Sequence, residues 1–107
     1  MSHDFDAQRE ETFWVWNDLI EKHGPMPPAV LEMQFVPADE TADAEKFDGL
    51  LQAVGYQVSH YEDDDTVEAA IGPLELSGDV IWTHELATSK IALNCGYRPD
   101  GWGFLQQ

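Results

Sequence analysis

Hydrophobic residues from Phe5 to Ile20 recur with the period of an α-helix. Their stripe consists of Phe5, Phe13, Trp16, Leu19 and Ile20. Trp14 points nearly the opposite way on a helical wheel. Gly24 suits the position just after a helix, and the prolines of "HGPMPP" cannot continue one. The pattern therefore predicts a helix over residues 6–23, with Trp14 outside its buried side.

Two later segments also carry helical periodicity. Over residues 40–54, Asp39 or Thr41 can cap the start and Gly55 can follow the end. Over residues 78–94, Ser77 can cap the start and Gly96 can follow the end. The latter helix is apolar on two sides, a narrow stripe of Ile81, His84, Thr88, Ile91 and Cys95, and a second side of Trp82, Leu86 and Leu93. We expect the helix over residues 6–23 to cover that second side.

Alternating apolar and polar residues predict strands over residues 30–36, 56–61 and 66–72. The acidic run "EDDD" joins the second of these to the third. "GWGFL", residues 101–105, is expected to form a short last strand after a turn at Pro99, Asp100 and Gly101. Gly103 is expected to allow a close approach of the backbone.

The elements follow the order helix, then β-α-β-β-α-β. That order predicts an α+β, ferredoxin-like split βαβ fold with an additional N-terminal helix. We expect an antiparallel four-stranded sheet with the last strand paired inside it. A chain of 107 residues is expected to form a single domain spanning residues 1–107.

The net charge of −16 is the most informative feature of the composition. It arises because the chain has 21 acidic residues and only five Lys and Arg residues. Such a charge repels phosphate backbones and anionic membrane surfaces, so we expect no direct nucleic-acid or membrane binding. It attracts proteins with basic surfaces. We expect a cytoplasmic protein for three reasons. The sequence has a single cysteine, it starts with an acidic segment that lacks an apolar signal region, and it contains no apolar run long enough to span a bilayer.

Residues with catalytic spacing are scarce. "THELAT" has Thr88 where a zinc-binding helix needs its second His, and "IGPLELSG" lacks the Lys of a phosphate loop. His84 is expected to be a hydrogen-bonded core residue, and Cys95 a buried, inert thiol. The sequence therefore predicts no catalytic residue, no metal site and no cofactor, and we expect a protein that is not an enzyme.

Candidate contact residues for a protein partner fall into three groups. The first is the acidic run of Glu62, Asp63, Asp64 and Asp65, which forms either a solvated turn or a negative knob. The second is Trp14, an exposed aromatic residue that either rests on neighbouring side chains or contacts a partner. The third consists of Arg98, Asp100 and Trp102. For Trp102 we favour a structural role, packed against a helix or the sheet.

Two segments of this sequence resemble segments of the RraB family, the regulators of ribonuclease activity type B. "FDAQREET" matches the family at Gln8, Arg9, Glu10, Glu11 and Thr12, and "YRPDGWGF" matches it at Tyr97, Asp100, Gly101, Trp102 and Gly103, with Phe104 at an aromatic position. The resemblance implies an α+β, ferredoxin-like fold. It also implies a non-catalytic role, in which the protein binds RNase E, often through its basic scaffold, and inhibits RNA processing.

The leading hypothesis is therefore an acidic, protein-binding regulator of an RNA-processing enzyme. An immunity-type protein that neutralises a basic toxin nuclease is the first alternative. A small hydrolase built on paired carboxylates is the second, and it requires a pocket with convergent polar groups. The sequence does not distinguish a monomer from a weak dimer.

Overall fold

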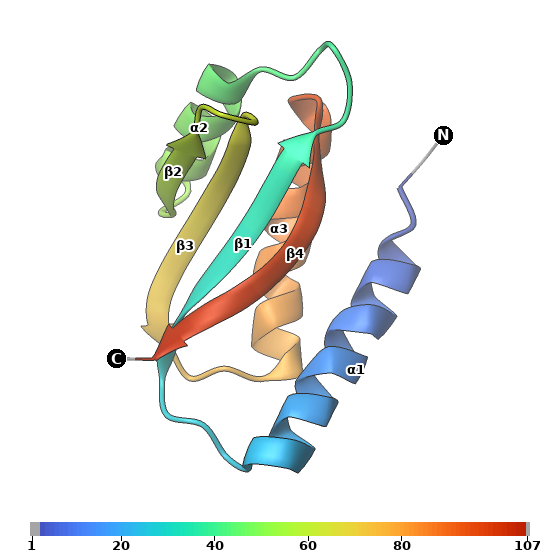
Figure 1. Ribbon diagram of the computed structural model, residues 1–107, viewed down its shortest axis with the longest axis vertical. Helices are drawn as coiled ribbons and strands as arrows, with labels where there is room; N and C mark the ends of the chain where they lie inside the picture. Colours follow the sequence, from blue (N-terminus) through green and yellow to red (C-terminus); the bar gives the residue numbers. More distant parts are fainter. Residues whose placement is uncertain (1–2, 107) are drawn as a thin grey trace.

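A computed structural model describes residues 3–106, and this part of the chain contains three helices and four strands (Figure 1). In chain order they are α1 (Phe5–His23), β1 (Ala29–Pro37), α2 (Ala44–Ala53), β2 (Gln57–Tyr61), β3 (Thr66–Leu74), α3 (Gly78–Asn94) and β4 (Tyr97–Gln106). The four strands form one antiparallel sheet in the order β2-β3-β1-β4. The predicted α+β class and the predicted antiparallel four-stranded sheet are confirmed.

The last strand lies at an edge of the sheet, and the prediction that it pairs inside the sheet is wrong. β1 is flanked by β3 on one side and by β4 on the other. After β3 the chain crosses through α3 and returns on the free side of β1, which is the outside of the sheet (Figure 1). One long ladder holds β4 to β1, from the pair Pro37 and Tyr97 to the pair Ala29 and Gln106.

β4 contains a bulge where the sequence predicts a turn. Phe35 pairs with Pro99 and Gln34 pairs with Gly101, so Asp100 has no counterpart on β1. Gly101 has φ +132°, a conformation that side chains with a Cβ rarely adopt. The predicted turn is therefore wrong. The residues that favour a turn form a bulge instead, because a bulge needs the same backbone freedom as a turn. Pro99 is tolerated because an edge strand has only one neighbour to bond.

The helix boundaries agree closely with the sequence for α1 and α3. Ser77 caps α3 by accepting a hydrogen bond from the Val80 backbone N–H at 3.1 Å. α2 is shorter than predicted and is capped by Asp43, which accepts from the Lys46 backbone N–H at 3.1 Å. Asp39 instead accepts from the Thr41 backbone N–H at 2.8 Å. This local bond holds a turn ahead of the helix, and α2 therefore begins at Ala44.

α2 and α3 pack on one face of the sheet, and no helix of the described residues covers the other face (Figure 1). The core lies between the sheet and these two helices. Its fully buried large side chains include Leu31, Met33, Phe35, Phe47, Leu51, Val67, Ile81 and Tyr97. None of the helices formed by residues 3–106 is long and apolar enough to cross a membrane.

α1 lies beside β4 and packs against α3 (Figure 1). On α3 the contact runs through small and polar residues. Phe13 lies so close to Gly78 that a Cβ there would be 2.6 Å from its ring, and Gln8 donates to the Ser89 hydroxyl at 3.1 Å. Trp82 and Leu86 are half-buried and Leu93 stays 37% exposed, so the predicted cover of this side of α3 is incomplete. Glycine and serine are small and let the two helices approach closely. Trp and Leu side chains are larger and would keep the helices farther apart.

Candidate functional site

The uncovered face of the sheet gathers acidic side chains from β1, β3, β4 and the β2–β3 hairpin tip. We call this surface the acidic face, and it consists of Glu32, Asp63, Asp64, Glu68 and Asp100. A shallow hollow of about 390 Å³ opens on it, lined by Gln34, Tyr61, Asp63, Asp64, Thr66 and Asp100. Gln34 donates a hydrogen bond to Glu68 at 3.3 Å and so holds one carboxylate beside the hollow.

Glu32 and Glu68 are neighbours on this face. Glu32 pairs with Ala70 and Gln34 pairs with Glu68 across β1 and β3, so the two glutamates lie on a diagonal. A hydrogen bond with Glu68 raises the pKa of Glu32, and burial and repulsion by Glu68 raise it further. Neither carboxylate belongs to an ion pair among residues 3–106, so the two glutamates lie on neighbouring strands without a compensating charge.

Two glycines of β4 leave a trough beside these carboxylates. Gly101 lies opposite Gln34, and Gly103 lies opposite Glu32. A Cβ built on either glycine would have no atom within 4 Å. The expected close backbone approach at Gly103 is therefore not found. The missing side chains instead give an outside molecule access to Glu32 and Gln34.

The acidic run at the β2–β3 tip forms an ordered, exposed turn. Asp64 accepts a hydrogen bond from the Thr66 backbone N–H at 3.1 Å, and bonds from Thr66 lower the pKa of Asp64. Asp65 has φ +58° and accepts through its carbonyl oxygen from the Tyr97 hydroxyl at 2.9 Å. These bonds hold Asp63 and Asp64 at the acidic face, while Glu62 is exposed at the tip.

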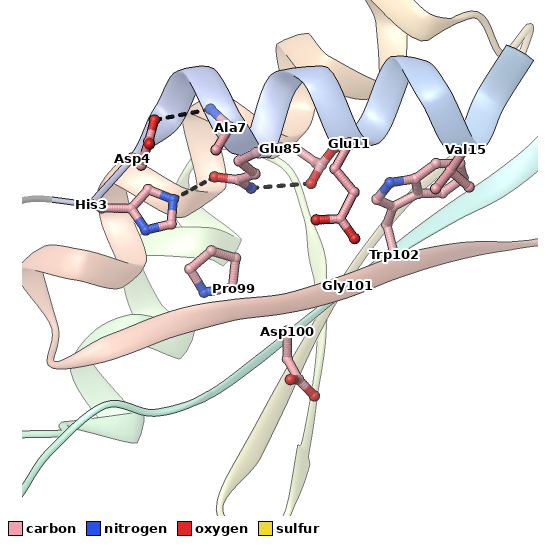
Figure 2. A pocket seen from close by; sticks show the side chains of 11 residues that line it. His3, Asp4, Ala7, Glu11, Val15, Glu85, Pro99, Asp100, Gly101 and Trp102 are labelled. Atoms are coloured by element: carbon pink, nitrogen blue, oxygen red, sulfur yellow. Dashed lines mark hydrogen bonds between the residues drawn. The ribbon is translucent and has the colours of Figure 1, made fainter.

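The other predicted contact residues do not form one surface. Figure 2 shows the Asp100 side chain on the side of β4 away from α1, and Trp102 pointing toward α1. Arg98 is exposed and pairs with Val36, which follows Glu32 and Gln34 on the same side of β1, so Arg98 lies on the side of the sheet that carries the acidic face. Trp14 is 69% exposed on α1 and lines neither the hollow nor the groove described next. Asp100 thus joins the acidic face, whereas Trp102 is partly buried and packs against the core.

A groove of about 550 Å³ runs between α1 and β4 (Figure 2). We call it the α1–β4 groove, and its lining residues are His3, Asp4, Ala7, Gln8, Glu11, Val15, Glu85, Pro99, Asp100, Gly101 and Trp102. The two segments that carry the family resemblance thus face each other across one groove, with Gln8 and Glu11 on α1 and Gly101 and Trp102 on β4.

Glu85 on α3 lies in this groove and is only 5% exposed. Its carboxylate accepts hydrogen bonds from the Thr12 hydroxyl and, at 3.1 Å, from the Gln8 side-chain amide. Burial raises the pKa of Glu85, the bonds from Thr12 and Gln8 oppose that rise, and the charge of Glu11 adds to it. The ion pairs found among residues 3–106 join Asp18 to Lys22 and Asp65 to His60, so none of them compensates Glu85.

The sequence does not single out Glu85, because the pattern of "THELAT" resembles only the start of a zinc-binding helix. One feature of the sequence does indicate that Glu85 is buried. Its carboxylate lies on the same side of the helix as the apolar residues Ile81 and Ala92. No group of three metal-ligating side chains occurs within residues 3–106.

The remaining chemistry agrees with the sequence-based expectations. His84 is half-buried and bonds through Nδ1 to the Tyr56 hydroxyl at 2.8 Å, and burial lowers the pKa of His84. Cys95 is buried, and burial raises the pKa of its thiol, which disfavours the reactive thiolate.

No protein-family model matches this chain, and no curated protein sequence matches it either. The functional argument therefore rests on the residues and on the geometry described above.

Proposed function

We propose that this protein is a non-catalytic regulator that binds a basic segment of a partner protein through its acidic face. Following the resemblance to the RraB family, the proposed partner is an RNA-processing enzyme of the RNase E kind. The proposal takes the protein to be a cytoplasmic single domain that works without a cofactor. It also takes the fold to be ferredoxin-like with an added N-terminal helix, since the strand order β2-β3-β1-β4 follows from two split βαβ crossovers.

The observation that carries this proposal is the pair of Glu32 and Glu68. The hydrogen bond with Glu68, followed by burial and the charge of Glu68, raises the pKa of Glu32, so the ionised form of Glu32 is disfavoured at this position. A guanidinium or ammonium group placed between the two would remove this repulsion, and so binding of a basic residue is favoured there. The glycine trough along β4 gives such a residue access to the pair.

The total charge supports the same proposal. A molecule with net charge −16 competes with RNA for an arginine-rich segment, because both present dense negative charge. Steering of this kind acts over a Debye length of about 8 Å at physiological salt and weakens as salt increases. Binding of the regulator would then displace RNA from the scaffold of the partner.

An immunity-type protein that neutralises a basic nuclease would use the same charge differently. An immunity protein covers the nuclease active site and abolishes cleavage of every substrate. A scaffold-binding regulator leaves the catalytic domain active on short RNA. A cleavage assay with short and long RNA, with the protein added in excess, distinguishes the two.

The hydrolase alternative is less favoured by the α1–β4 groove. The groove does bring polar groups together, as this alternative requires. Both hydrogen bonds to Glu85, however, come from Thr12 and Gln8 of the same chain, which engages the carboxylate in joining two helices.

The test of the acidic face uses two variants that each remove one negative charge. Glu68→Gln lies on the acidic face, whereas Glu10→Gln lies on the exposed side of α1. We expect Glu68→Gln to weaken binding to the basic scaffold segment about tenfold, as the loss of a charged hydrogen bond would. Glu10→Gln should change binding only slightly.

Binding by surface plasmon resonance at low and physiological salt measures both effects. We expect the association rate to fall as salt increases. Equal effects of the two variants, or an association rate that does not respond to salt, would contradict the proposal. Glu68→Gln should remain folded, because it removes a repulsion.

A further inference from the structure

We propose that the α1–β4 groove is a binding site for the guanidinium group of an arginine side chain, presented by a peptide segment of a partner. The proposal rests on the proposed function only in taking the arginine from a protein. The site itself is separate from the Glu32 and Glu68 pair on the acidic face.

The groove has the size of a ligand site. Its volume of about 550 Å³ lies within the range of roughly 300–1,000 Å³ that is usual for such sites. α1 forms one wall, β4 forms the other, and Glu85 of α3 lies between them (Figure 2). One side chain with part of its backbone fits this space, which is far larger than a metal ion needs.

The charge of the groove is negative and lacks an internal cation. Asp4, Glu11 and Glu85 line it, and no Lys or Arg does so among the described residues. Figure 2 shows the Glu11 side chain directed from α1 toward β4, on the same side as Glu85. A planar guanidinium has five N–H donors, and it can therefore bond two carboxylates that approach from different elements.

Glu85 is held in place before any ligand arrives. Thr12 and Gln8 each donate one hydrogen bond to its carboxylate, and Gln8 is itself held by Ser89 at 3.1 Å and by His3 at 2.7 Å. A carboxylate has about four acceptor positions, so two bonds leave capacity for a further donor. A preorganised carboxylate loses little entropy on binding.

Trp102 explains why we favour arginine over lysine. Its indole lies beside Val15 at one end of the groove, on the side of β4 that faces α1 (Figure 2). A guanidinium stacks on an indole face and bonds carboxylates in its own plane at the same time. An ammonium group is a compact, strongly hydrated charge and gains less from this arrangement.

The same geometry makes the binding of a guanidinium group depend on the protonation of Glu85. The groups that face Glu85 across the groove are Glu11 and Asp4 from α1 and its cap, and His3, while Asp100 lies on the β4 rim. A cation bound there lowers the raised pKa of Glu85, and binding therefore releases protons. The affinity should fall as the pH is lowered through the raised pKa of Glu85.

The experiment titrates the full chain with the peptide acetyl-Gly-Arg-Gly-amide and follows chemical shifts by NMR. The matched peptide has Lys in place of Arg. We expect the Arg peptide to shift the indole N–H signal of Trp102 and to bind more tightly than the Lys peptide. Glu11→Gln, which is exposed and outside the hydrogen-bond network of Glu85, should lower the affinity about tenfold. Glu10→Gln is the control on the same helix and should bind normally.

Several outcomes would overturn the proposal. These are the absence of shifts at Trp102, shifts confined to the acidic face, equal binding of the two peptides, and normal binding by Glu11→Gln. The proposed function would still stand if the long basic segment bound the chain and Glu68→Gln weakened that binding. Failure of the long segment to bind would remove the proposed function instead, whatever the peptide does at Trp102.

Discussion

The hydroxyl of Thr12 on α1 donates a hydrogen bond to the buried carboxylate of Glu85 on α3, across 73 positions of sequence. Gln8 adds a second bond to the same carboxylate. α1 packs chiefly on α3, so this carboxylate lies at the point where the N-terminal helix joins the rest of the molecule. The stability of the contact therefore depends on the protonation of a single side chain.

Glu85 should make stability depend on pH. Its folded pKa lies above the ordinary value of 4.5, so the folded state binds more protons than the unfolded state between these two values. The free energy of unfolding therefore falls as pH rises through this window, and it stays reduced above the folded pKa.

The variant Glu85→Gln removes this dependence and keeps the shape of the side chain. Urea unfolding between pH 4.5 and pH 8 should show the variant gaining stability relative to the wild type as pH rises. Glu10→Gln, on the exposed side of α1, serves as the control and should follow the wild type. A constant difference between wild type and Glu85→Gln across this range would contradict the prediction.

Three glycines of the last segment should differ sharply when replaced by alanine. Gly96 has φ +76°, and a Cβ there would lie 2.6 Å from the Ala42 backbone nitrogen, so Gly96→Ala should cost about 3 kcal/mol. Gly101 has φ +132° in open space, and its replacement should cost about 1–2 kcal/mol. Gly103→Ala should change stability by less than about 0.5 kcal/mol. Chemical denaturation gives the free energy of unfolding of each of the three variants. A large loss of stability in Gly103→Ala would contradict the open trough.

Trp102→Ala should be strongly destabilising. Trp102 pairs with Met33 across β4 and β1 and packs against the core while remaining partly exposed. Truncation of a fully buried Trp costs about 3–5 kcal/mol, and truncation of a partly buried Trp should cost about 3 kcal/mol. The measurement is the midpoint and slope of urea unfolding. A variant of nearly native stability that no longer binds the partner would contradict the packing role and would make this segment the recognition site.

Trp14→Ala should leave stability within about 0.5 kcal/mol of the wild type, because the side chain is 69% exposed. Thermal unfolding measures this directly. Partner affinity, measured on the same variant, tests the predicted contact role of Trp14. Unchanged affinity would remove Trp14 from the set of contact residues, and lost affinity at native stability would place it there.

The helices and strands with local signals follow directly from the amino-acid sequence. α1 ends before Gly24 and α3 begins after Ser77 because backbone freedom and side-chain caps act over three or four residues. The alternation of Leu31, Met33 and Phe35 with polar residues likewise identified β1 and its buried face. The exposure of Trp14 followed from its position on the helical wheel.

The places where these elements meet depend on the fold of the whole chain. Whether β4 lies inside or at the edge depends on the direction of the α3 crossover, to which no local pattern corresponds. The unpaired Asp100 depends on the register against β1, and the position of Glu85 depends on α1 docking 73 residues away in sequence. These relationships arise from burying apolar surface over long separations, and such burial is a property of the whole chain rather than of any short segment.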